Sequence, residues 1–296
     1  MTKVLNFGSL NIDYVYNVEH FVCPGETICA LNRSTYAGGK GLNQSTALAK
    51  AGAAVYHAGS VGFDSDILLN ALKSAGVHLD DIDYQDAPSG HTIIQVDRFG
   101  QNCIIVFGGT NHMISKKHID QTLAHFDKGD ILLLQNEINN LSYLINKAYE
   151  KGLHIALNPS PIDATIATLP LEKIKYFIVN EIEGAQICGA KTNETIIPLM
   201  TKKYPHASIL LTLGADGAMY FDGQKTYSQP IFKVKAVDTT AAGDTFLGYF
   251  INGLLNKLPI PKILEIAAKA ASITVSHKGA AQSIPTIDTV LSALNQ

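Results

Sequence analysis

Short apolar runs alternate with amphipathic stretches along most of this chain. Runs rich in β-branched and other apolar residues, which are typical of buried strands, occupy residues 3–10, 54–61, 130–134, 154–157, 176–180 and 208–213. Apolar residues recur at helical spacing between several of these runs, at 41–52, 64–75, 115–125 and 139–151. The alternation predicts a three-layer α/β fold with a mostly parallel central sheet and helices on both faces.

Two segments, residues 14–36 and 90–107, break this pattern. They alternate as antiparallel strands without an intervening helix, and residues 97–101 are typical of a hairpin turn. Either an edge extension of the main sheet or a small separate sheet would account for them. Both alternating sets of the second segment are apolar: Ile93, Ile105 and Phe107 in one set, and Ile94, Val96 and Ile104 in the other. A sheet that is apolar on both faces should be covered on both.

Size and composition narrow the class of protein. The chain has 296 residues, of which 46% are hydrophobic and 17% charged, so we expect a single α/β domain over residues 1–296. The net charge is −3 and only Arg33 and Arg98 carry guanidinium groups, so no nucleic-acid partner is expected. No apolar run approaches the roughly 18 residues that span a bilayer, and no signal peptide is recognisable, so we expect no membrane contact and a cytoplasmic location. The four cysteines and ten histidines show no metal-ligand spacing.

Residues 237–246 combine a loop of residues with small side chains and a carboxylate. Ala241, Ala242 and Gly243 have almost no side chain, and the apolar periodicity that follows predicts a helix starting near Gly243. The unpaired amides of a helix N-terminus bind anions well, phosphate above all. Asp244 on the same turn could accept a proton from an attacking hydroxyl. The alternative interpretation is an ordinary helix start with an acidic first turn.

Other polar residues follow the predicted strands. Asn11 and Asp13 come after the first strand, Glu137 after the run at 130–134, and Asn180 ends its own strand. Ligands of parallel sheets gather outside the carboxyl ends of the strands. Each carboxylate alone could equally be a solvated loop residue. The turn at 38–41, Gly-Gly-Lys-Gly, fits neither a P-loop nor a dinucleotide-binding loop, because no Ser or Thr follows Lys40 and Gln44 stands where the last glycine should be.

Four segments together resemble the ribokinase-like (PfkB) carbohydrate kinase family. They are residues 8–13 with 24–27, residues 37–44, the Asn-x-x-Glu motif at 180–183, and the signature at 238–246, in the order of the family and spanning residues 6–283. The resemblance implies the ribokinase-like fold with a small β-sheet lid formed by 14–36 and 90–107. It also implies ATP-dependent phosphorylation of the primary hydroxyl of a sugar, D-ribose by expectation. A kinase for 2-deoxyribose, a nucleoside or another furanose remains an alternative, as does a sugar-binding regulator without catalysis.

The resemblance also implies roles for individual residues. Asp244 would be the base, with Ala242 and Gly243 forming the anion hole. The sugar would be bound by Asn11, Asp13, Gly39, Lys40, Asn43 and Glu137, and the nucleotide by Asn180, Thr212, Gly214, Gly217 and Gly243. Glu183 would hold Mg²⁺ through water. An activating K⁺ would lie among Asp238, Thr240, Thr274, His277, Gly279 and Ser283, although many relatives carry Arg at the position of His277. Adenine is expected between Thr212 and the helix at 262–275, and a homodimer is expected to form through the lid.

Overall fold

The computed structural model describes residues 2–295 and has a nine-stranded main sheet. Its strands are β1 (Val4–Phe7), β4 (Val55–Val61), β5 (His78–Tyr84), β8 (Ile131–Gln135), β9 (His154–Asn158), β10 (Tyr176–Asn180), β11 (Ser208–Thr212), β12 (Ala218–Phe221) and β13 (Thr226–Gln229). They lie in the order β13-β12-β11-β10-β9-β8-β1-β4-β5. Only β12 and β13 run antiparallel to their neighbours, so the predicted mostly parallel sheet is confirmed.

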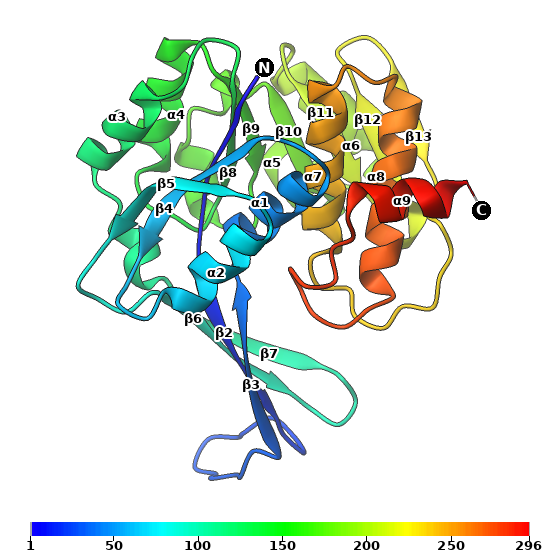
Figure 1. The fold of residues 1–296 in the computed structure, drawn as a ribbon. Coiled ribbons are helices and arrows are strands. Elements are labelled where there is room, and N and C mark those ends of the chain that lie inside the picture. The colour runs from blue at the N-terminus through cyan, green and yellow to red at the C-terminus, as the bar shows by residue number, and fades with distance from the viewer. Residues whose placement is uncertain (1, 296) are drawn as a thin grey trace.

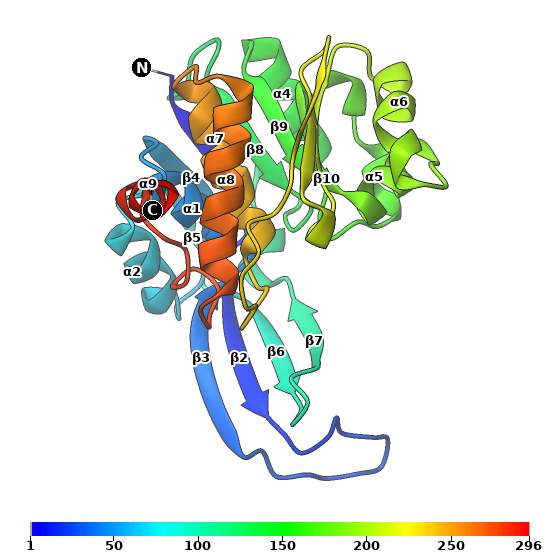
Figure 2. The same cartoon turned by 90° about the vertical axis from the view of Figure 1, so that its right-hand side faces the viewer.

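Helices cover both faces of this sheet (Figures 1 and 2). One layer contains α1 (Lys40–Lys50), α2 (Asp66–Ser74), α7 (Ala242–Leu255), α8 (Ile260–Val275) and α9 (Ile287–Leu294). The other contains α3 (Lys116–Ala124), α4 (Leu141–Lys151), α5 (Glu181–Cys188) and α6 (Asn193–Lys203). Across residues 2–295, no helix is both long and apolar enough to cross a membrane.

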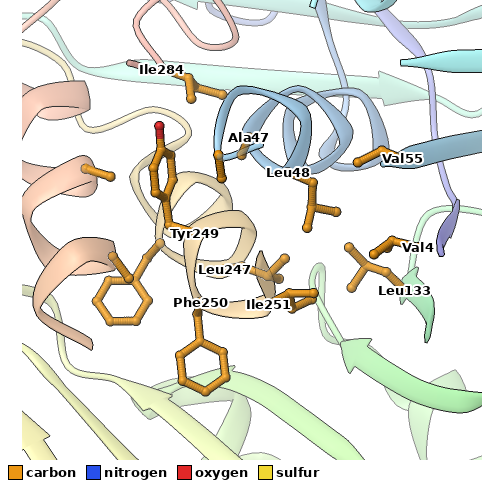
Figure 3. Packing of buried hydrophobic residues seen from close by; sticks show 14 of the residues in the cluster. Val4, Ala47, Leu48, Val55, Leu133, Leu247, Tyr249, Phe250, Ile251 and Ile284 are labelled. Atoms are coloured by element: carbon orange, nitrogen blue, oxygen red, sulfur yellow. The ribbon is translucent and has the colours of Figure 1, made fainter. Parts of the chain in front are cut away.

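The alternation of side chains along the central strands builds two hydrophobic cores. In β8, Ile131 and Leu133 pack into the core under α1, α7 and α8, whereas Leu132 and Leu134 pack into the core under α3 to α6. Buried residues of α7, including Leu247, fill the space beside α1 (Figure 3). The first turn of α7 is thereby fixed beside the first turns of α1.

Four further strands form a separate small sheet, in the order β3-β2-β6-β7, that projects from one end of the main body (Figure 2). They are β2 (Asn11–Asn17), β3 (Asn32–Gly38), β6 (Gly90–Val96) and β7 (Asn102–Phe107). The predicted hairpin turn is confirmed, because the Asp97 N–H donates to the Gln101 carbonyl between β6 and β7.

The two segments predicted to form antiparallel strands do so, and they join side by side in this sheet. The pairs β2–β3 and β6–β7 are antiparallel, but the central pair β2–β6 is parallel. Both central strands leave the main body in the same direction, which sets this pairing. The strands also begin earlier than predicted, at Asn11, and residues 18–31 between β2 and β3 form a loop.

Candidate active site

The carboxyl ends of neighbouring strands bring polar side chains to one edge of the main sheet. The strands β1, β8, β9 and β10 are adjacent, and β1 lies where the chain reverses its direction of winding, between β8 and β4. Glu137 follows β8, and Asn158 and Asn180 end β9 and β10. The predicted polar residues therefore converge on the switch point of the sheet.

The N-terminus of α7 lies at this edge, where the Ala242 N–H donates to the Thr239 carbonyl over 3.3 Å. Ala241 precedes the helix in the left-handed region at φ 61°, and in the part of the chain that the structure describes no side chain caps the helix. Gly243 is exposed, and a Cβ added there would meet no atom within 4 Å. The positive end of the helix dipole is thus open to an anion.

Asp244 lies on this turn and is held by two residues of α1. The Gln44 amide donates to Asp244 Oδ1 over 2.8 Å, and the Asn43 amide donates to Oδ2 over 3.3 Å. The buried Asn43 Oδ1 has no hydrogen-bond partner among residues 2–295. A buried acceptor without a donor is costly, so this oxygen is suited to a ligand hydroxyl.

The turn before α1 needs glycine at two positions. Gly39 has φ +94°, and a Cβ at Gly38 would fall 1.9 Å from Asp13 Oδ2. The turn therefore brings backbone against Asp13. It also reaches Glu137, because the Lys40 N–H donates to Glu137 Oε2 over 3.0 Å, and Ser9 donates to the same oxygen.

Burial and the neighbouring Glu137 carboxylate raise the pKa of Asp13 to about 6, although a hydrogen bond from Thr92 opposes this rise. Thr92 lies directly opposite Asp13 in the parallel β2–β6 pair, and its hydroxyl donates to Asp13 Oδ1 over 2.6 Å. Asn11 is also buried, and its Oδ1 accepts from the Asn111 amide over 2.7 Å. These contacts fix the side chains that β2 contributes to the site.

Two cavities meet at the start of α7. The larger, of about 540 Å³, lies between the β11–β12 connection and α8; Asn180, Thr212, Gly214, Gly217, Ala242, Gly243, Ala268 and Ser272 are among its lining residues. The smaller, of about 240 Å³, is lined by Lys40, Asn158, Asn180, Glu183, Thr212, Ala242, Gly243 and Asp244 among others. Because Asn180, Thr212, Ala242 and Gly243 line both, the two cavities adjoin at the first turn of α7. Asn11, Asp13, Asn43 and Glu137 do not line either cavity.

Asn180 and Glu183 form a capping box at the start of α5. The Glu183 carboxylate accepts from the Asn180 N–H over 3.0 Å and from the Asn180 side chain over 3.1 Å, and the Glu183 N–H donates to Asn180 Oδ1. Glu183 is buried but still lines the smaller cavity. With both oxygens engaged, this carboxylate fits a water-mediated contact to Mg²⁺ better than direct ligation.

The structure brings together the two segments predicted to hold a monovalent cation. Asp238 Oδ1 accepts from the Thr240 N–H over 2.9 Å and Oδ2 from the Gly279 N–H over 3.0 Å. Burial raises the pKa of Asp238, but hydrogen bonds from the Thr240 side chain and from these two N–H groups, with the charge of Lys278, lower it overall. The side chains of His277 and Ser283 are instead bonded within α8 and its following loop, and the Thr274 hydroxyl bonds the Ala270 carbonyl of α8 and the Thr245 hydroxyl of α7. Any role for these three in cation binding would fall to their carbonyl groups. Within residues 2–295, no cluster of three or more His, Cys, Asp or Glu side chains could hold a metal.

Four residues of the site were missed by the sequence analysis: Ser9, Gln44, Thr92 and Asn158. Ser9 and Thr92 orient the carboxylates of Glu137 and Asp13, and Gln44 joins Asp244 to Asn158. Gln44 lies next to Asn43 and Asn158 ends a predicted strand, and both positions could have marked them. Nothing in the pattern distinguishes Ser9 or Thr92.

Comparison with known proteins assigns the family. The sequence pattern of the pfkB family carbohydrate kinases matches residues 1–287. Ribokinase of Haemophilus influenzae is 33% identical over 97% of this chain and 96% of that protein. A bifunctional ribokinase/ribose-5-phosphate isomerase A of Fructilactobacillus sanfranciscensis is 33% identical over 100% of this chain, which spans 57% of its length. The structure of Arabidopsis thaliana ribokinase complexed with ribose and ATP superposes with a TM-score of 0.89 at 31% identity, covering 100% of this chain and 99% of that one. The chain therefore belongs to the pfkB family of carbohydrate kinases.

Proposed function

We propose that this protein transfers the γ-phosphoryl group of ATP to the primary hydroxyl of D-ribose, giving D-ribose 5-phosphate and ADP. One observation carries the proposal: the Asp244 carboxylate stands on the uncapped first turn of α7, where two cavities meet. The similarity to proteins named ribokinase supports ribose as the sugar.

Polar groups from three parts of the chain, namely β2, the start of α1 with its preceding turn, and the turn after β8, bind the sugar in this proposal. Asp13 and Glu137 accept hydrogen bonds from its hydroxyls, because carboxylates are strong acceptors for neighbouring hydroxyl pairs. Asn43 contributes the unpartnered Oδ1. Asn11, Gly39 and Lys40 complete the binding set through side-chain and backbone groups.

Asp244 acts as the base in the transfer. The oxygen of the primary hydroxyl forms a bond to the γ-phosphorus while the bond from that phosphorus to the β,γ-bridging oxygen breaks. The hydroxyl proton passes to Asp244, and ADP leaves with the electron pair of the broken bond. The amides of Ala242, Gly243 and Asp244 hydrogen-bond the phosphoryl oxygens as charge develops on them.

The larger cavity receives the nucleotide. Thr212, Gly214 and Gly217 lie on one side of it, and the apolar face of α8 at Ala268 and Ala271 suits a purine ring on the other. Asn180 and Glu183 would hold Mg²⁺ through water in the adjoining cavity. That ion neutralises charge on the phosphates when it is bound.

A monovalent cation, K⁺ in our proposal, binds where Asp238 joins the two loops. Asp238 and Thr240 come from the segment before α7. The carbonyls of Thr274, in the last turn of α8, and of His277, Gly279 and Ser283, in the loop that follows, would complete the site. The same Asp238 leads directly into the anion-binding turn. A cation there would order that turn without entering the chemistry.

The small sheet serves as a lid over the sugar and as the contact of a homodimer. On its edge strand β7, Ile104, Ile105, Val106 and Phe107 are between 50% and 59% exposed. Apolar residues are therefore exposed on both alternating sets of this strand. Two lids that pack together would cover this surface.

Asp244→Asn tests the proposal. The change is nearly isosteric and removes the proton acceptor, and general-base catalysis contributes about 10²- to 10⁴-fold. We expect kcat for ribose, measured by coupled ADP release, to fall by at least about 10²-fold. Ribose binding measured by calorimetry should weaken far less. Near-full turnover by this variant would mean that Asp244 is only a helix-start residue, and every catalytic role above would have to be reassigned.

A further inference from the structure

A chain of buried side-chain amides runs beneath the proposed active site and ends at Asp244. Asn6, Gln44 and Gln135 are each 0–1% exposed. Gln135 Nε2 donates to Asn6 Oδ1 over 2.9 Å and to Gln44 Oε1 over 2.7 Å. Gln44 Nε2 then donates to Asp244 Oδ1 over 2.8 Å and to Asn158 Oδ1 over 3.0 Å. The chain links β1, β8, α1, β9 and α7.

Backbone carbonyls fix the direction of every amide in this chain. At one end Asn6 Nδ2 donates to the Gly41 carbonyl over 2.8 Å, so Asn6 Oδ1 must face Gln135. At the other end Asn158 Nδ2 donates to the Ile178 carbonyl over 3.0 Å, so Asn158 Oδ1 must face Gln44. A carbonyl can only accept, and each amide nitrogen has two protons to give. Both ends therefore require Gln44 to present its N–H groups to Asp244 and Asn158.

The chain extends further into the core through Ser45. Its hydroxyl accepts from Asn6 Nδ2 over 2.8 Å and lies 2.8 Å from His57 Nδ1. Complete burial lowers the pKa of His57 to about 4, so the imidazole is neutral at pH 7 and can accept the serine proton. The donors and acceptors of these hydrogen bonds are therefore mutually compatible from His57 to Asp244.

Close packing around Gln135 also preserves this hydrogen-bond network. A Cβ at Gly8 would lie 2.4 Å from Gln135 Oε1 and 2.7 Å from the Gly41 Cα. A side chain at position 8, directly after β1, would therefore collide with Gln135, so this position needs glycine. The amide nitrogens of Asn6, Gln44 and Gln135 are all paired, whereas the buried Gln135 Oε1 has no hydrogen-bond partner among residues 2–295. The paired donors hold these side chains in one orientation.

We propose that Gln44 is a positioning residue for phosphoryl transfer, which rests on the proposed role of Asp244 as the base. Its buried amide holds Oδ1 of Asp244 and thereby fixes the plane of the carboxylate. Asn43 holds Oδ2 only weakly, at 3.3 Å. Oδ2 is therefore the oxygen that accepts the proton of the sugar hydroxyl. Gln44 touches neither the sugar nor the nucleotide in this scheme.

The first test is Gln44→Met, which keeps the length of the side chain and removes both donors. A misplaced catalytic group costs up to about 10²-fold, so we expect kcat to fall by about tenfold to a hundredfold. Ribose and ADP dissociation constants, measured without turnover, should stay within about twofold. Gln135→Met removes the donors to Gln44 and Asn6 but leaves the bond from Gln44 to Asp244 in place, so it should lower kcat by a smaller factor. This second variant keeps the test usable if Gln44→Met does not fold.

Asn252→Leu is the matched control. Asn252 also bonds α7 to α1, because its amide donates to the Ala51 carbonyl over 2.7 Å at the far end of the two helices. Its loss should lower the melting temperature much as Gln44→Met does, but leave kcat unchanged. An equal fall of kcat in both variants would assign the effect to helix packing and overturn the inference.

A double-mutant cycle separates positioning from general damage. In the Asp244→Asn background there is no base to position, so adding Gln44→Met should not lower kcat further. Multiplicative losses would overturn the inference. If Gln44→Met is fully active and Asp244→Asn is inactive, the role of Gln44 is overturned but the proposed function is not. If Asp244→Asn is fully active, both the proposed base and the role of Gln44 are overturned.

Discussion

Asp13 should make the protein less stable at neutral pH, and Asp13→Asn should reverse this effect. The folded state raises the pKa of Asp13 from 3.8 to about 6, chiefly because the carboxylate is buried. A shift of about two units corresponds to about 3 kcal/mol. A group whose pKa is raised on folding contributes stability below its unfolded pKa and loses it as the pH rises through the folded pKa. The penalty of burying the Asp13 carboxylate is thus fully present above about pH 7.

The assay is urea unfolding of the wild type and Asp13→Asn between pH 4 and pH 8. Asparagine at this position can still accept the hydrogen bond from the Thr92 hydroxyl, but it has no charge that folding would bury. We expect the variant to gain stability relative to the wild type as the pH rises, by up to about 3 kcal/mol at pH 8. Its affinity for ribose should fall over the same range.

The difference between the two proteins is the informative quantity. Burial lowers the pKa of His57 from 6.5 to about 4, so this residue contributes stability that is lost as the pH falls below about 6.5. Its effect opposes that of Asp13 and would flatten the wild-type curve. Asp86→Asn makes the same substitution at an exposed carboxylate and serves as the control. A pH-independent difference for Asp13→Asn, or a less stable variant at pH 8, would refute the reasoning.

Three further predictions concern substrate, cation and assembly. Ribose should exceed 2-deoxyribose in kcat/KM by about tenfold or more, because an unpaired buried acceptor costs about 1–3 kcal/mol; equal values would contradict ribose as the substrate. K⁺ should raise activity above choline at equal ionic strength, and Asp238→Asn should abolish the difference; a wild type indifferent to K⁺ would remove the cation site. Light scattering at micromolar concentration should find a dimer that Ile105→Asp dissociates, and a wild-type monomer would count against pairing of the lids.

The sequence predicts the parts of the fold that follow from local pattern. The six predicted strands of the main sheet match β1, β4, β8, β9, β10 and β11 within a few residues. The strand β5 was missed because it lies at the edge of the sheet and carries three aspartates, which interrupt the apolar run. The strands β12 and β13 have four residues each and were too short to give a clear pattern.

Tertiary partners decide the rest of the site. Gln44 is fully buried, yet a polar residue on the first turns of a helix is usually expected at the surface. Only the meeting of β8, α1 and α7 shows that it bonds Asp244. The parallel pairing of β2 with β6, which places Thr92 on Asp13, likewise joins segments far apart in the sequence. Periodicity along one segment contains no information about such pairs.

The attachment of the small sheet at one end divides the proposed sugar site between two parts of the molecule. Asp13 belongs to β2 and would move with the small sheet, whereas Glu137 follows β8 and stays with the main sheet. If the sheet swings about its base near Asn11 and Gly90, the distance between these two carboxylates changes. A sugar that hydrogen-bonds both carboxylates would then link the small sheet to the main sheet. The affinity for the sugar would then include the free energy of moving the small sheet toward the main sheet. A substitution in the remote β7 could therefore weaken sugar binding without contacting the sugar.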